Sequence, residues 1–291
     1  MSTPAESSFW AAPRQLGRSA VRVSPLGLAA LSVRLGAPRG PGLAPSEVER
    51  AFHELGINTF LVTPEMRSLA QGVRLLVRSG HRQEITIISM ASIPTGWTVR
   101  RAWEHGATAL GVDYLDAFLL GWVQARWYVT GRTWPAMQAL KEAGKVRALG
   151  FSCHHRPLAV ELGRELGVDV LMIRYNAAHR GAEQEIFATL GDNRPGIISY
   201  TATRWGNLLS PLVDRGFAQG LPAADCYRFA LSHPAVDVAL CAAHSWAELC
   251  QDVAGVSAGP LSEARQKEVR AFGDAVHAAA RGGNRWMFRQ G

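Results

Sequence analysis

Histidine and arginine side chains recur in three short segments in the middle of the chain, a pattern suited to acid–base chemistry on an anion. The first segment carries His154, the second carries Arg174 and His179, and the third carries Arg204. Guanidinium groups bind carboxylates and phosphates through paired hydrogen bonds, and an imidazole beside them can take up a proton. We therefore expect a site for an anionic small molecule, with Arg174, His179, Arg204, His154 and Glu65 as candidate catalytic residues.

These residues also have simpler interpretations. Each histidine can be a hydrogen-bonded loop residue, and Arg174 can pair with an acid such as Glu183. Cys153, His154 and His155 are residue types that bind metals, but adjacent side chains rarely converge on one ion and no further ligand is apparent. We therefore expect no metal site.

The elements that must position these residues alternate along the chain. Short apolar runs, each suited to a buried strand, are separated by longer stretches with helical periodicity. Repeated strand–helix units predict a parallel sheet, and because no glycine-rich phosphate motif follows the first strand, a closed (β/α)8 TIM barrel is favoured over an open sheet. Residues 15–24 predict an N-terminal β-hairpin that plugs the barrel floor. The predicted strands are residues 26–31, 59–62, 85–89, 117–120, 148–152, 170–175, 196–201 and 236–241, and the predicted helices include 46–55, 98–110, 134–143, 158–166 and 261–280.

Composition and charge limit the class of protein. The chain has 291 residues, 47% of them hydrophobic and 19% charged, which suits one barrel domain over residues 13–281, between a flexible N-terminal tail 1–12 and a C-terminal tail 282–291. The net charge of +7 comes from scattered basic residues, so we expect no nucleic-acid partner. No apolar run approaches the roughly 20 residues of a membrane span, and the four cysteines lack the spacing of a metal site or a disulfide scaffold. We expect a cytoplasmic protein that binds a small molecule; its oligomeric state is not predicted.

Several segments resemble, in order along the chain, the motifs of one enzyme family. Any one match is weak, but together they are collinear and correctly spaced over about 250 residues. The matching segments are 16–27, Gly56-Ile57-Asn58, 110–116, 144–152 and Arg174-Tyr175-Asn176 with Arg180. On these segments the chain resembles the aldo/keto reductases, which are TIM barrels that reduce carbonyl groups with NADP at the C-terminal mouth of the barrel.

The resemblance implies which positions correspond to the family's catalytic tetrad of Asp, Tyr, Lys and His. It assigns Leu61 to the Asp position, Met66 to the Tyr position, Met90 to the Lys position and Gly121 to the His position. None of these four residues can usefully donate or accept a proton. The resemblance therefore predicts a barrel that has lost the family's reductase mechanism.

The resemblance also implies an altered NADP site. Ser152 and Tyr200 match residues that contact the nicotinamide, whereas Cys153 and Met172 replace the amide side chains expected to bind its carboxamide. Near the last strand, Asp252 replaces an amide with an acid. The residues assigned to NADP in this way are Ser152, Tyr200, Gly206, Ser245, Gln251 and Asp252.

The sequence is compatible with three functions of different classes. The chain can be an enzyme with a rebuilt pocket that acts on an anionic small molecule. It can be an NADP-dependent oxidoreductase with another proton donor, such as His154 or Tyr128. It can also be a non-catalytic subunit that binds a ligand or a protein, because a fold alone does not carry a function across a lost site.

Overall fold

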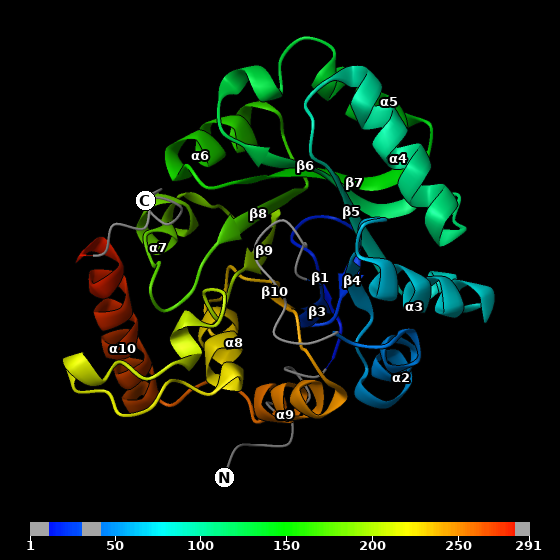
Figure 1. Cartoon of the computed structure of the whole chain (residues 1–291). Coiled ribbons are helices and arrows are strands. Elements are labelled where there is room, and N and C mark those ends of the chain that lie inside the picture. The colour runs from blue at the N-terminus through cyan, green and yellow to red at the C-terminus, as the bar shows by residue number, and fades with distance from the viewer. Residues whose placement is uncertain (1–11, 31–41, 283–291) are drawn as a thin grey trace.

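The structure, a computed structural model, describes residues 12–30 and 42–282. Its centre is a closed barrel of parallel strands in the order β10-β3-β4-β5-β6-β7-β8-β9, and helices surround these strands (Figure 1). The predicted (β/α)8 barrel is therefore confirmed. The barrel strands are β3 (Leu26–Leu28), β4 (Thr59–Leu61), β5 (Thr86–Ala91), β6 (Leu115–Val123), β7 (Val146–Cys153), β8 (Val170–Arg174), β9 (Gly196–Tyr200) and β10 (Val238–Cys241).

Strands β5, β6 and β7 extend further towards their carboxyl ends than the apolar pattern predicts. β6 pairs with β7 as far as Val123 and Cys153, with an irregular register after Leu120. β5 pairs with β6 as far as Ala91. As a result, Met90 and Gly121 lie within their strands and not after them, because hydrogen bonds to neighbouring strands continue past the last strongly apolar residue.

The helices follow the strands in the order that the sequence predicts, with small shifts at their ends. Several have clear start signals: Pro45 occupies the first turn of α2, and the Ser245 hydroxyl accepts a hydrogen bond from the Glu248 backbone N–H at the start of α9. In the part of the chain that the structure describes, no helix is long and apolar enough to cross a membrane. The α-helices are α2 (Pro45–Leu55), α3 (Arg67–Arg78), α4 (Gly96–Leu110), α5 (Thr133–Glu142), α6 (Arg156–Glu165), α7 (Ala182–Glu185), α8 (Ala223–Leu231), α9 (Trp246–Ser257) and α10 (Glu263–Gly282), and the short 3₁₀ helices are η2 (His81–Gln83), η3 (Arg126–Tyr128), η4 (Phe187–Thr189), η5 (Asn207–Leu209) and η6 (Val213–Arg215).

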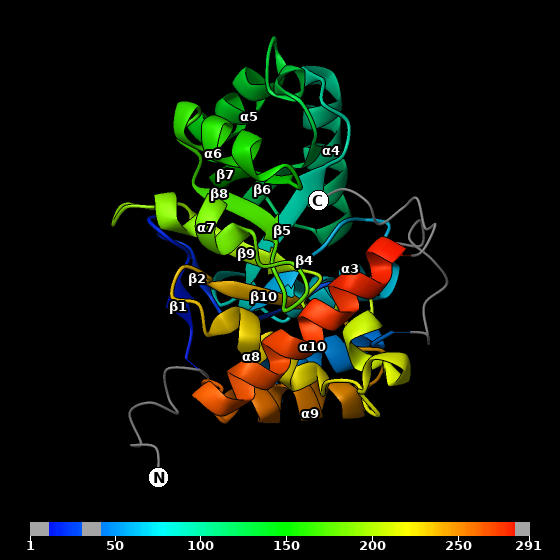
Figure 2. The same cartoon turned by 90° about the vertical axis from the view of Figure 1, so that its left-hand side faces the viewer.

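An antiparallel hairpin closes the amino-terminal end of the barrel, as the sequence predicts. It consists of β1 (Arg14–Gln15) and β2 (Arg22–Val23), and it lies at one side of the barrel in Figure 2. Leu16 and Val23 are fully buried and join the cluster of inward-facing strand residues. The turn depends on Gly17, which has a left-handed φ of 51° and whose missing Cβ would lie 2.1 Å from the Gly196 nitrogen. The hairpin thus fills the barrel floor with apolar side chains and leaves the other end open.

Buried aspartates at the starts of strands set the register between neighbours. An oxygen of Asp116 accepts a hydrogen bond from the Ile87 backbone N–H at 2.9 Å, and one of Asp237 accepts from the Ile197 N–H at 2.8 Å. Arg194 holds Asp237 from the other side at 2.7 Å. Each contact ties the start of one strand to its neighbour, and the negative charge of Asp237 is compensated by a guanidinium.

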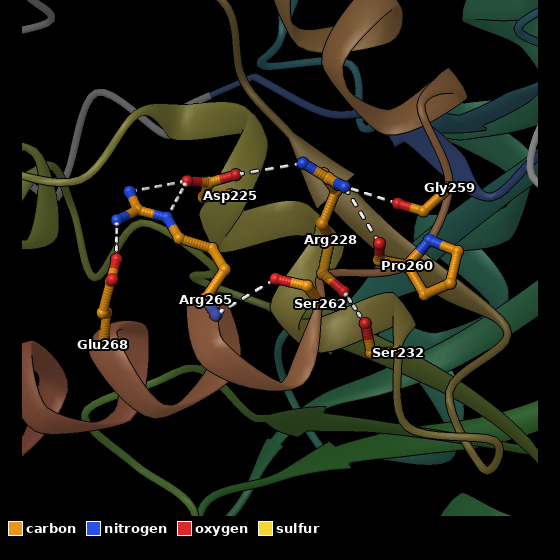
Figure 3. A network of polar contacts seen from close by, with 8 residues as sticks. All are labelled: Asp225, Arg228, Ser232, Gly259, Pro260, Ser262, Arg265 and Glu268. Atoms are coloured by element: carbon orange, nitrogen blue, oxygen red, sulfur yellow. Dashed lines mark hydrogen bonds and ion pairs between the residues drawn. The ribbon is translucent and has the colours of Figure 1, made fainter. Parts of the chain in front are cut away.

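The long helix α10 is fixed to the barrel through α8. Asp225 of α8 lies between two guanidinium groups, accepting from Arg265 of α10 at 2.8 Å and from Arg228 at 3.3 Å (Figure 3). Arg228 also donates to the Gly259 carbonyl in the connection between α9 and α10. This network holds the start of α10, whose far end lies on the side of the barrel away from the hairpin (Figure 2).

The predicted tails 1–12 and 282–291 lie outside the described residues except for residue 12 and Gly282, where α10 ends. The proposed domain boundaries at residues 13 and 281 therefore stay predictions.

Replacing Gly17 by Ala should destabilise the fold by about 2–4 kcal/mol, because the new methyl group meets backbone atoms of β9 in addition to forcing a strained φ. Gly56→Ala is the matched control, since Gly56 has a similar φ of 69° and nothing within 4 Å of its missing Cβ. The control should lose only about 1 kcal/mol. Urea unfolding of both variants measures this difference, and equal losses would show that the hairpin does not close tightly on the barrel.

Candidate functional site

A large cavity opens at the carboxyl ends of the barrel strands. Its volume is about 2040 Å³. Its floor is formed by residues near the ends of the strands, among them Leu61, Met90, Met172, Tyr200 and Leu240. The hairpin blocks the other end, so this mouth is the open end of the barrel, as is usual for binding sites in this architecture.

Arg174, Tyr200 and His154 form a polar cluster in the cavity wall. Arg174 ends β8 and pairs in register with Tyr200, which ends β9. His154 follows β7, and its Nε2 lies 3.1 Å from the Tyr200 hydroxyl. All three side chains therefore meet because three consecutive strands of the barrel end side by side.

The electrostatics of this cluster favour a neutral imidazole beside a cation. Burial lowers the pKa of His154 to about 4, and the Arg174 guanidinium acts in the same direction. Burial raises the pKa of Tyr200 above its ordinary value. At neutral pH the cluster offers a positive guanidinium, an uncharged imidazole that can accept a proton and a phenol that can donate a hydrogen bond.

His179 and Arg204, which the sequence groups with Arg174, lie behind the cavity wall and not in it. His179 is 8% exposed, and its ring lies 5.2 Å from that of His277 in α10. Arg204 is 5% exposed and donates a hydrogen bond to the Val276 carbonyl at 3.1 Å. Burial and then Arg174 and Arg204 lower the pKa of His179 to about 3. The three basic residues are neighbours, but only Arg174 among them lines the cavity.

The other residues singled out from the sequence divide between the cavity and its surroundings. Glu65, Ser152, Gly206, Gln251 and Asp252 line the cavity. The Ser152 hydroxyl accepts a hydrogen bond from the Trp122 backbone N–H at 2.7 Å.

Ser245, Tyr128 and His155 have local roles outside the cavity lining. Ser245 is the N-cap of α9, and the His155 ring nitrogen accepts from the Leu158 N–H at the start of α6. The ring of Tyr128 packs against that of Trp127. Of the two alternative proton donors considered from the sequence, only His154 therefore lines the cavity.

The four positions assigned by resemblance to a tetrad gather at one side of the mouth. Leu61, Met66 and Met90 line the cavity, and a Cβ at Gly121 would lie 3.9 Å from the Met90 sulfur. No lysine is among the described residues that line the cavity. This side of the mouth therefore presents apolar atoms, and its correspondence to the family's tetrad stays a prediction.

A second polar group lies at the end of β10 and on α9, next to β9 in the barrel. Asp252 of α9 is 6% exposed, and its Oδ2 lies 3.6 Å from the Cys241 sulfur. Tyr227 of α8 packs beside them and also lines the cavity. Sequence reasoning missed Tyr227, because its position in a helical apolar pattern is that of an ordinary core residue.

The loop after β9 is held in a strained backbone conformation. Thr201, Arg204 and Trp205 have left-handed φ values of 42°, 51° and 52°. Each such residue costs on the order of 1–3 kcal/mol unless its surroundings compensate, and strain of this kind often accompanies binding sites. Here the Arg204 hydrogen bond to α10 is one compensating contact.

The buried carboxyl of Asp252 should make stability depend on pH. Burial raises its pKa to about 7, and the nearby Glu248 acts in the same direction. An unfolded Asp has a pKa of about 3.9, so between about pH 4 and pH 7 only the folded state holds the proton and unfolding free energy falls as pH rises.

Asp252→Asn cannot titrate and should remove this component. Relative to the wild type, its unfolding free energy should rise by roughly 2–3 kcal/mol between about pH 5 and about pH 8. Urea unfolding at these pH values measures the effect, and parallel pH profiles for the two proteins would mean that Asp252 titrates normally.

Two comparisons with known proteins match part of this chain. The model of the aldo/keto reductase family matches residues 90–216. The 9,11-endoperoxide prostaglandin H2 reductase of Trypanosoma cruzi (strain CL Brener) is 31% identical over 105 residues, a match that spans 34% of this chain and only 35% of that protein.

Solved structures match over most of the chain. Aldo-keto reductase AKR11C1 from Bacillus halodurans aligns with a TM-score of 0.71 and 20% identity, covering 89% of this chain and 95% of that one. PA4992 from Pseudomonas aeruginosa aligns with a TM-score of 0.65 and 23% identity, covering 84% and 94%. These likenesses establish the fold. The resemblance expected from the sequence is thereby confirmed: the chain has the barrel fold of the aldo/keto reductases, and residues 90–216 match that family's model.

Proposed function

We propose that this chain is an enzyme with a rebuilt pocket that binds an anionic small molecule at Arg174. The observation that carries the proposal is the cluster of Arg174, His154 and Tyr200 in the cavity wall. In this proposal Arg174 binds the carboxylate or phosphate of the ligand. His154 accepts a proton from another group of the same ligand, and the Tyr200 hydroxyl orients the His154 imidazole.

The surroundings of Arg174 support anion binding. Burial lowers its pKa, and the guanidinium groups of Arg156 and Arg204 act in the same direction. An anion at Arg174 lowers the electrostatic energy of this group of cations. Arg174 is 9% exposed, so its side chain has already lost much of its conformational freedom and can bind an oxyanion with two hydrogen bonds at a low entropic cost.

The position of His154 supports its role as a general base. It lines the cavity, and its lowered pKa keeps the imidazole neutral at physiological pH. A neutral imidazole can accept a proton from a ligand held by Arg174. His179, the other candidate base, lies behind the wall, where the Arg174 guanidinium helps to lower its pKa, and in this proposal it does not contact the ligand.

We further propose that the family's carbonyl-reducing mechanism has been lost. The apolar side of the mouth, formed by Leu61, Met66 and Met90 beside Gly121, supports this proposal because it offers no proton donor to a developing alkoxide. A reaction in this cavity therefore depends on the opposite side, where His154 and Tyr200 lie.

Anion binding is tested by thermal and urea unfolding with a panel of small carboxylates and phosphates. An anion at roughly 100-fold its Kd should raise the unfolding free energy of the wild type by about 3 kcal/mol. Arg174→Gln should abolish the increase. Arg101→Gln is the matched control, because Arg101 lines the same cavity from α4, and it should respond like the wild type. No effect of any anion on the wild type, or equal effects on all three proteins, would disprove the proposed site.

The lost mechanism is tested by assaying NADPH oxidation with aromatic aldehydes and simple ketones. We expect turnover well below the roughly 1 per second at the lower end of ordinary enzymes. Robust turnover that persists in His154→Gln and Tyr200→Phe variants would show that a proton donor exists elsewhere in the mouth.

A further inference from the structure

The cavity is less basic than the chain as a whole. The described residues that line it include the carboxyl groups of Glu65, Glu104, Glu248 and Asp252, four in all, against the guanidinium groups of Arg101 and Arg174. The complete chain, in contrast, has a net charge of +7. The described lining residues therefore carry no excess of positive charge that would attract polyanions.

Two of these four carboxyl groups lie on one wall, which we call the acidic wall. It consists of Glu248 and Asp252 of α9 with His244, Cys241 and Tyr227. Among the described lining residues from Pro222 to Asp252 there is no lysine or arginine. The positive group at Arg174 belongs to β8, so the two kinds of charge occupy different parts of the mouth.

The Glu248 carboxylate occupies the amino-terminal end of α9. Helix N-termini bind phosphates because their first N–H groups lack partners within the helix. Here a Glu248 carboxylate oxygen accepts a hydrogen bond from the His244 N–H at 2.8 Å and lies 3.4 Å from His244 Nδ1. The Glu248 N–H donates in turn to the Ser245 hydroxyl at 3.2 Å. The His244 and Glu248 N–H groups, two of the donors at this end, are therefore already used.

Asp252, one helical turn further along α9 than Glu248, adds a second carboxyl group to the wall. It is almost fully buried, and the neighbouring groups that affect its protonation are Cys241 and Glu248, neither of which is a cation. A phosphate ester carries a charge of about −1.5 to −2 at pH 7, so placing one here brings like charges together in a partly desolvated site.

NADP, the cofactor that the family resemblance implies, does not fit this wall. We infer that the acidic wall excludes phosphate groups, so the cavity is not an NADPH site and takes a ligand whose end at this wall presents N–H or O–H donors. The carboxyl oxygens of Asp252 and the exposed Glu248 are suitable acceptors for a protonated amine or a pair of hydroxyl groups. This inference does not depend on anion binding at Arg174, which lies on another strand.

The test is calorimetric titration of NADPH into the wild type, the double variant Glu248→Gln/Asp252→Asn and the control Glu104→Gln. Glu104 is an exposed carboxylate that lines the same cavity from α4, so the control removes a charge outside the acidic wall. Circular dichroism checks that the double variant is folded. If it is not, the single variant Glu248→Gln, which changes only an exposed side chain, replaces it in the test.

We expect weak NADPH binding to the wild type and to Glu104→Gln, and binding at least about tenfold tighter to the double variant, since the Glu248 carboxylate and the partly ionised Asp252 near a phosphate oppose binding by about that factor. The NADPH affinity of Glu248→Gln should lie between those of the wild type and the double variant. Tight NADPH binding to the wild type would overturn the inference, and so would equal affinities in the wild type and the double variant. Neither result bears on the anion titrations of Arg174→Gln, so the two proposals fail separately.

Discussion

The eight parallel strands form a closed barrel with no unpaired edge, so their inward-facing side chains fill the barrel interior. This closure determines at which end of the barrel a ligand can bind. The strands approach so closely that a Cβ at Gly150 of β7 would lie 2.0 Å from the Val170 carbonyl oxygen of β8. At the amino end the interior is filled by Leu16 and Val23 of the hairpin. At the carboxyl end it is not, and the cavity begins there.

Closure also explains why residues far apart in the sequence form one polar cluster. His154, Arg174 and Tyr200 come from three consecutive strands, which end side by side because their backbone hydrogen bonds hold them in register. A basic residue at the end of β8 therefore lies next to whatever ends β9. The same geometry places the apolar residues Leu61 and Met90 together on β4 and β5.

The two polar groups of the mouth have opposite electrostatic character, and in both the charged form is destabilised by burial. Burial lowers the pKa of Arg174 and raises that of Asp252. In each case a ligand group of complementary charge would recover part of the lost solvation. The two proposals together describe a small-molecule ligand that is anionic near β8, rich in hydrogen-bond donors near α9 and without several phosphates.

Helix α10 supports this arrangement from outside the cavity. It is fixed at its start by Arg265 and Asp225, and near its end the Val276 carbonyl accepts a hydrogen bond from Arg204. Arg204 belongs to the loop after β9, whose left-handed residues are stable only with such contacts. The shape of the mouth therefore depends in part on a helix that does not line it.

The sequence by itself determined the architecture: the alternation of apolar runs and helical stretches predicts each barrel strand to within a few residues, because strand burial requires continuous apolar runs. It also made Arg174 and His154 candidates, since polar residues after barrel strands stand out, and it made Tyr200 a candidate through the family resemblance. Only the tertiary structure decided that His179 and Arg204 lie behind the wall, because the direction of a loop side chain depends on packing against α10, which is remote in sequence. Likewise, the sequence shows Glu248 and Asp252 only as two acids one helical turn apart. The position of Glu248 at the start of α9, and of Asp252 against Cys241 and Tyr227, follows from how α8, α9 and β10 pack together.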